Sequence, residues 1–172
     1  PFAQGNANNM FLTPRIKPAN KKKSLSQPGL ATNVKLFQAV KDNQVEAVQQ
    51  LLSESAEFER QTGDPLVDVN FHYSVEGKQT PIHIAAKHNN ATIMELLVSA
   101  GADVNAQDGL QRTPLHMATS LGAHECAILL LSHGAKLNVR DHYGNAPFHL
   151  SVRGHYFDIA HDFILFGADI NF

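Results

Sequence analysis

Apolar residues recur at helical spacing along most of the chain. The first such pattern predicts a helix pair over Val34–Ser53, with a break near Asp42 and Asn43. Two later patterns each predict the apolar body of a helix, over Ile93–Val98 and over Cys126–Leu131. No apolar run reaches the roughly 18 residues that a membrane span needs. The pattern therefore favours amphipathic helices that pack on one another.

Two short phrases repeat with the same period of 33 residues. The first begins with a capping residue and proline and ends with histidine, at Thr80–His83, Thr113–His116 and Ala146–His149. The second begins with glycine and ends with asparagine, at Gly101–Asn105, Gly134–Asn138 and Gly167–Asn171. Because the two phrases share one period, they predict one structural unit that is copied along the chain.

Each unit carries signals for where its helices begin and end. Thr80 and Thr113 are predicted N-caps whose hydroxyls satisfy an unpaired backbone N–H, and a proline follows at the first helical position. The glycine of the second phrase is predicted to end the second helix in a left-handed conformation. Ala146 replaces the capping threonine in the last unit, so we expect the first turn of that helix to be the least stable.

The period and the Thr-Pro-Leu-His-x-Ala type of phrase resemble the ankyrin-repeat family over about Asn33–Phe172. The resemblance implies an all-α solenoid of about four helix-turn-helix units with β-hairpin fingers. Its repeats would cover 33–77, 78–110, 111–143 and 144–172. It also implies a recognition scaffold, whose partners differ from member to member.

The residues before the repeats differ in composition. Residues 1–32 are predicted to form an extended or disordered arm without an acidic residue, whose basic side chains are Arg15, Lys17, Lys21, Lys22 and Lys23. The remaining chain has nine basic and sixteen acidic residues, a formal charge of −7. A solvated linker is the favoured interpretation of the arm, and a nuclear-import signal, a nucleic-acid contact or docking onto the repeats are the alternatives.

The first unit is longer than the others. Residues 53–67 are expected to form an acidic loop insertion, with Glu54, Glu57, Glu59 and Asp64, and the connection Phe71–Gln79 is two residues longer than Ala106–Arg112. A specific contact and a tolerated surface loop both remain open for this insertion.

Neither a metal site nor a catalytic site is predicted. Three of the ten histidines, His83, His116 and His149, occupy the repeated phrase. Successive helical layers lie about 8–10 Å apart, whereas each zinc ligand must lie about 2.0–2.1 Å from one ion. The resemblance instead implies that these imidazoles are structural hydrogen-bonding groups between neighbouring loops. Cys126 lies among apolar positions and is interpreted as a buried hydrophobic residue, and no cofactor-binding motif is present.

Superposing the units predicts a binding surface. In ankyrin-like stacks the last positions of the first helix face the concave side, and three of the four units have a cation there, at Lys41, Lys87 and Arg153. The second helices carry acids instead, at Glu46, Glu95, Glu125 and Asp158. The candidate partner-binding residues are Lys41, His72, Tyr73, Lys87, His88, Leu110, Arg112, Ser120, Leu121, Arg140, His142, Tyr143, Asn145 and Arg153. Ordinary solvated positions are the alternative interpretation.

We therefore expect a non-catalytic protein–protein interaction module that binds a partner protein or an extended acidic or phosphorylated peptide. The alternative is a targeting domain of a larger enzyme or effector, since the chain starts at Pro1 and stops after a closing phrase, as a piece of a longer protein would. Nucleic acid is not expected, because the body repels phosphates, and neither is a small-molecule substrate. A lone cysteine favours an intracellular location, cytoplasmic or nuclear. The apolar fourth unit is expected to be covered by a further repeat, a domain or a second chain.

Overall fold

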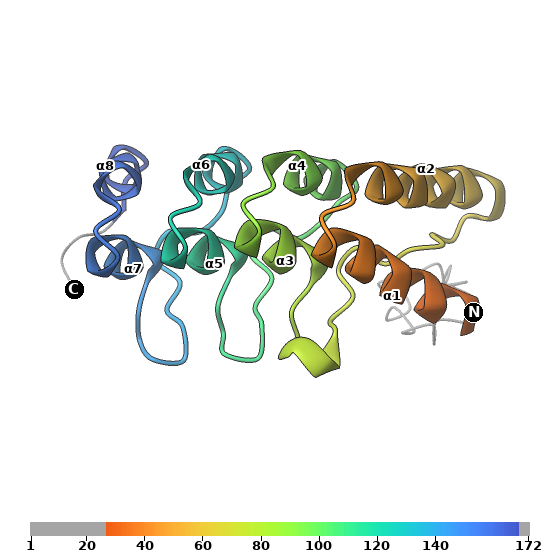
Figure 1. The fold of residues 1–172 in the computed structure, drawn as a ribbon, viewed down its shortest axis with the longest axis horizontal. Coiled ribbons are helices and arrows are strands. Elements are labelled where there is room, and N and C mark those ends of the chain that lie inside the picture. The colour runs from red at the N-terminus through yellow and green to blue at the C-terminus, as the bar shows by residue number, and fades with distance from the viewer. Residues whose placement is uncertain (1–26, 169–172) are drawn as a thin grey trace, which may run out of the picture.

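A computed structural model describes residues 27–168 and shows a linear stack of four helix pairs (Figure 1). The inner row contains α1 (Gln27–Lys41), α3 (Pro81–Lys87), α5 (Pro114–Ser120) and α7 (Pro147–Arg153). The outer row contains α2 (Val45–Thr62), α4 (Ala91–Ser99), α6 (His124–Ser132) and α8 (Phe157–Leu165). Each helix contacts its partner and the equivalent helix of the next pair. The fold is the repeat solenoid that the 33-residue period predicts.

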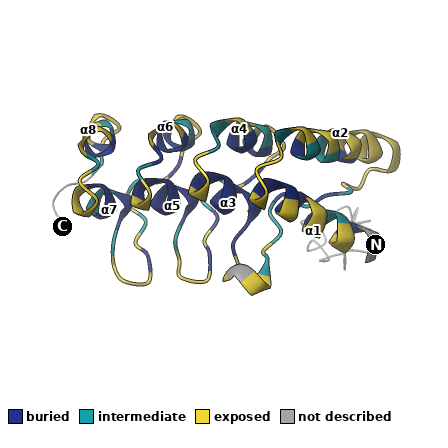
Figure 2. Cartoon of the chain, viewed as in Figure 1, coloured by how far each residue is buried: buried dark blue, intermediate teal, exposed yellow. Residues whose placement is uncertain are grey.

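The hydrophobic core runs continuously between the two rows, as the buried segments in Figure 2 show. Each pair contributes fully buried side chains, among them Val40, Ile82, Leu97, Leu115, Leu130 and Phe163. Small residues such as Ala85, Ala86 and Ala118 are also buried in the inner helices, where they allow neighbouring helices to approach closely. Within residues 27–168, no helix is long and apolar enough to span a membrane.

The first pair differs from the sequence-based boundaries at both ends. Helix α1 begins at Gln27, so the last six residues of the expected arm are helical. The buried side chain of Asn33 fixes this helix, because its Oδ1 accepts a hydrogen bond of 2.8 Å from the backbone N–H of Asp68. What was expected of the rest of the arm lies outside the described residues.

The expected loop insertion is wrong over most of its length, because α2 continues to Thr62. This segment is rich in glutamate, glutamine and alanine, which favour helix, and side-chain hydrogen bonds join Gln50 to Glu54 and Gln61 to Glu57. Gly63 ends the helix with a φ of 78°. The Oγ of buried Ser55 then accepts a hydrogen bond of 3.0 Å from the N–H of Val67 and holds the returning chain.

Three fingers project from the inner row, at 71–79, 106–112 and 139–145 (Figure 1). They are loops and not the expected β-hairpins, since residues 27–168 contain no strand and only an isolated bridge between Tyr73 and Gln79. One backbone hydrogen bond of 2.9 Å closes the second finger, from Asp108 N–H to Arg112 O, and another closes the third, from Asp141 N–H to Asn145 O. The longer first finger contains a 3₁₀ turn, η1 (Ser74–Glu76).

A buried histidine joins each inner helix to the next finger. The Nδ1 of His83 accepts a hydrogen bond from the N–H of Thr80 and lies 2.8 Å from the Thr80 hydroxyl. The ring hydrogen is therefore on Nε2, which donates to the carbonyl oxygen of Arg112 at 3.0 Å. His116 makes the equivalent bonds, to Thr113 and to the carbonyl of Asn145 at 3.1 Å. The imidazoles thus link neighbouring loops, and they also take part in the helix cap, which the sequence analysis did not assign to them.

These imidazoles make the stability of the stack sensitive to acid. Burial lowers the pKa of His83 and of His116 below 6.5, so both rings are neutral in the folded state at neutral pH. As the pH falls below the unfolded value, the unfolded chain binds protons that the folded chain does not. The stabilisation is therefore complete above that value and is lost progressively below it.

We expect His116→Gln to flatten the pH dependence of the free energy of unfolding, measured with urea between about pH 7.5 and about pH 5.5. The difference in slope from the wild type is at most about 1.4 kcal/mol per pH unit, the limit for one proton. His133→Gln, at an exposed histidine, is the matched control. Equal slopes in the wild type and in His116→Gln would contradict the assignment.

Candidate functional site

Each of the last two fingers is wrapped around a buried carboxylate. In the second finger, Asp108 accepts hydrogen bonds from the backbone N–H groups of Leu110 and Arg112, both at 2.9 Å. The Arg112 guanidinium adds two more, from Nε at 2.9 Å and from a terminal nitrogen at 2.7 Å. In the third finger, Asp141 accepts from the backbone N–H groups of Tyr143 and Asn145 at 2.9 and 2.8 Å.

The Asp108–Arg112 pair is the strongest electrostatic contact in this region. The Asp108 side chain is 1% exposed, and burial alone would raise the pKa of its carboxyl. The hydrogen bonds from the Arg112 side chain and from the backbone of Arg112 and Leu110 outweigh burial and hold that pKa below its ordinary value. Asp108 is therefore ionised at neutral pH and neutralises Arg112.

The finger tips are coupled to one another through the backbone. The N–H of Gly109 donates to the carbonyl of Gly77 at 2.8 Å, and the N–H of His142 donates to the carbonyl of Leu110 at 2.9 Å. Gly109 has no room for a Cβ, which would lie 2.9 Å from that Gly77 oxygen. The three fingers thus form a connected row rather than independent loops.

A hollow of about 530 Å³ lies between the last two inner helices and their fingers. Its walls come from α5, α7 and the feet of two fingers, and its lining residues are Arg112, His116, Ser120, Asp141, Tyr143, Asn145, Leu150 and Arg153. Arg153 and Ser120 are exposed at the ends of their helices, and Tyr143 is 71% exposed. The hollow therefore combines an accessible cation, a hydroxyl and an aromatic ring.

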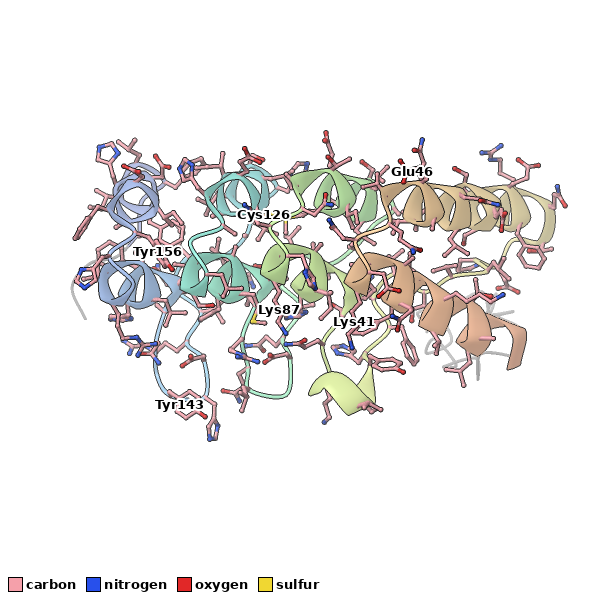
Figure 3. The ribbon with its side chains drawn as sticks, in the orientation of Figure 1. Lys41, Glu46, Lys87, Cys126, Tyr143 and Tyr156 are labelled. Carbon is pink, nitrogen blue, oxygen red and sulfur yellow. The ribbon has the colours of Figure 1, made fainter. Side chains whose placement is uncertain are left out.

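Five of the candidate binding residues meet at this hollow: Arg112, Ser120, Tyr143, Asn145 and Arg153. Lys41 and Lys87 lie along the same boundary between inner helices and fingers, farther towards the N-terminal end of the stack (Figure 3). His88 and Leu121 directly follow α3 and α5 and are both exposed. Lys87, Ser120 and Arg153 are each the last residue of an inner helix, so they occupy equivalent places in three successive repeats.

Other candidates have structural contacts within their own fingers. Tyr73 lies at the foot of the first finger, where its ring stacks on Phe37 with centroids 4.4 Å apart. His72 contacts the carbonyl of Lys78 through Nδ1 at 2.8 Å. Arg140 donates to the carbonyl of Gly144 at 3.1 Å within the third finger.

Leu110 and His142 remain exposed at the tips, where they add to the surface beside Tyr143.

The sequence analysis did not include Asp108 and Asp141, which organise the fingers. A signal for them was present, because they lie 33 residues apart and each is followed four residues later by a candidate binding residue. Leu150, which lines the hollow, was also missed.

The other chemical candidates lie away from the fingers. The thiol of Cys126 is fully buried in the core, and burial raises its pKa to about 11, so it is a hydrophobic core residue as the sequence indicated. Glu46, Glu95, Glu125 and Asp158 are all exposed on the outer helices, and Figure 3 shows Glu46 on the side opposite the fingers. Among residues 27–168, no cluster of three or more His, Cys, Asp or Glu side chains could hold a metal ion.

These features define the class of protein: a helical-repeat scaffold with an inner surface shaped by helix ends and fingers. The family model for ankyrin repeats in three copies matches residues 36–141 and 82–172, and the chain belongs to the ankyrin-repeat family. Ankyrin repeats are generally protein–protein interaction modules and typically non-catalytic. No curated protein matches the chain.

We expect Asp108→Asn to destabilise the fold by about 1–3 kcal/mol, because the variant loses a buried charge-assisted contact with Arg112. Equilibrium urea unfolding at neutral pH measures the change. Glu95→Gln removes an equal charge from an exposed position and is the matched control. A loss no larger than that of the control would show that the pair does not hold the finger.

Proposed function

We propose that the inner surface binds an extended acidic or phosphorylated segment of a partner protein. The observation that carries this proposal is the hollow between the third and fourth repeats, around which five candidate binding residues from two helices and two fingers meet. Hollows lined by a few convergent polar groups are the usual place for a ligand side chain. The supporting geometry is local to this part of the surface.

The electrostatics of the surface narrow the choice of ligand. Arg112 is paired with Asp108, and Asp141 is buried behind the third finger, so neither gives the hollow a large net charge. The accessible cations are Arg153 beside the hollow and Lys87 one helix end farther along the row. A carboxylate or phosphate at the hollow would contact Arg153 and the remaining N–H groups of Arg112, whose guanidinium is already held in place.

The linear arrangement of equivalent helix ends favours an extended ligand. Lys87, Ser120 and Arg153 repeat once in each layer, and such regular spacing suits a chain that runs along the stack. Exposed Tyr143 and Leu121 add apolar contact area beside the polar groups. The outer helices, where Glu46, Glu95, Glu125 and Asp158 are exposed, would repel the same ligand.

The module acts without catalysis and inside the cell, in the cytoplasm or nucleus. In support, the single cysteine is a buried thiol that needs no oxidising compartment. The proposal also includes the fourth repeat, whose exposed apolar residues, Val152, Phe157, Ile164, Leu165 and Phe166, form a surface that another structure would cover.

We expect Arg153→Glu to weaken binding of acidic or phosphoserine peptides about tenfold or more, and Lys87→Glu to weaken it less, since Lys87 lies outside the hollow. Fluorescence anisotropy with a pool of labelled ten-residue peptides, about equal in acidic, phosphorylated and neutral members, measures the Kd. Lys136→Glu makes the same charge change at an exposed lysine outside the hollow and is the matched control. The groove proposal fails if the wild type and Arg153→Glu retain the same peptides with equal affinity.

A further inference from the structure

The exposed apolar residues of α7 and α8 fall into two groups when they are compared with the preceding repeats. Val152 is 47% exposed, whereas Thr119 and Ala86, at the equivalent positions 33 and 66 residues earlier, are fully buried. Ile164 is 50% exposed, whereas Leu131, 33 residues earlier, is 6% exposed. Phe148 is partly buried, whereas Leu115 and Ile82 at its equivalent positions are fully buried. These three positions become buried wherever another repeat follows.

The residue types at these positions are those of an inner repeat. A terminal repeat that faces water carries a polar outer surface. Here the three positions hold valine, isoleucine and phenylalanine, with no polar substitution. The surface therefore continues the apolar pattern of the repeat-to-repeat interface past the last helix pair of the structure.

The opposite end of the stack shows what a water-facing repeat looks like in this chain. Three residues before the end of the inner helix, the later repeats have Ile84, Met117 and Leu150, all buried. The first repeat has Gln38 at that place, exposed and hydrogen-bonded to Asp42. The first repeat is thus adapted to solvent, and the fourth is not.

We propose that the surface formed by Phe148, Val152 and Ile164 packs against a further ankyrin-type repeat that continues the stack in the same register. The inference rests on the proposal that the fourth repeat is covered, and it is independent of peptide binding in the hollow. It identifies the occupant by position: a following helix pair would bury these three side chains as repeats three and four bury their equivalents.

The second group of exposed apolar residues provides an internal control. Leu165 lies at the position of Ser132 and Ser99, and Phe157 at the position of His124; Ser132, Ser99 and His124 are all exposed. A following repeat in the same register leaves this group uncovered. The proposal therefore separates Ile164 from Leu165, although the two residues are adjacent and both exposed.

The test adds a repeat to the chain. A copy of residues 107–139 placed directly after Phe172 keeps the 33-residue register. We expect the thermal unfolding midpoint to rise by about 4 °C or more relative to the unextended chain, as ~1–2 kcal/mol of added interface would give. Ile164→Lys should abolish this rise, and Leu165→Lys should leave it unchanged. The same variants in the unextended chain, checked by circular dichroism, correct for effects on folding.

Two results would overturn the proposal. The first is a midpoint that the added repeat does not raise, or raises equally in the Ile164→Lys background. The second is concentration-dependent dimerisation of the unextended chain in sedimentation, abolished by Ile164→Lys, which would make a second copy the occupant. Peptide binding in the extended and unextended chains, measured in parallel, separates either failure from a failure of the groove proposal.

Discussion

The stack depends on one buried imidazole per repeat that satisfies two loops at once. Nδ1 accepts from the first residue of the repeated phrase, and Nε2 donates to a carbonyl 29 residues farther along, in the next finger. Both bonds require the neutral ring with its hydrogen on Nε2, and burial favours that state. A single side chain thus fixes the start of a helix and the distance to the next repeat.

This constraint also shapes the candidate site. Arg112 and Asn145, which accept the two histidine bonds through their carbonyl groups, line the hollow with their side chains. The side chain of each is held in turn by the buried carboxylate of its own finger, Asp108 or Asp141. Because backbone and side chain are both fixed, a ligand would meet walls that are already ordered, and little conformational entropy is lost on binding. The same contacts that build the stack therefore prepare its inner surface.

The sequence predicted what the period controls and missed what packing controls. The 33-residue phrases predicted the helix pairs and their order, and these are confirmed by the family match. The extension of α2 was missed because residues 53–67 lie outside the period, and only the contact of Ser55 with Val67 shows how that segment is held. The pairing of Arg112 with Asp108 was missed because a charge count cannot show that a cation is already neutralised. Tyr73 was assigned to a tip because its finger has no equivalent length, whereas stacking on Phe37 places it at the foot.

A linear stack has two ends, and the energetics of this chain differ between them. In a repeat protein each unit contacts only its neighbours, so the residues at an end are stabilised by one interface rather than two. The first repeat offsets this with a longer α2, with the bond between Asn33 and Asp68 and with a polar Gln38 towards solvent. The fourth repeat has a short α8 of nine residues and lacks the capping hydroxyl at Ala146, yet it exposes Val152 and Ile164. An end that is both less supported and more apolar gains more from a neighbour than the other end does. The direction in which the stack can grow is therefore set by the side chains of α7 and α8.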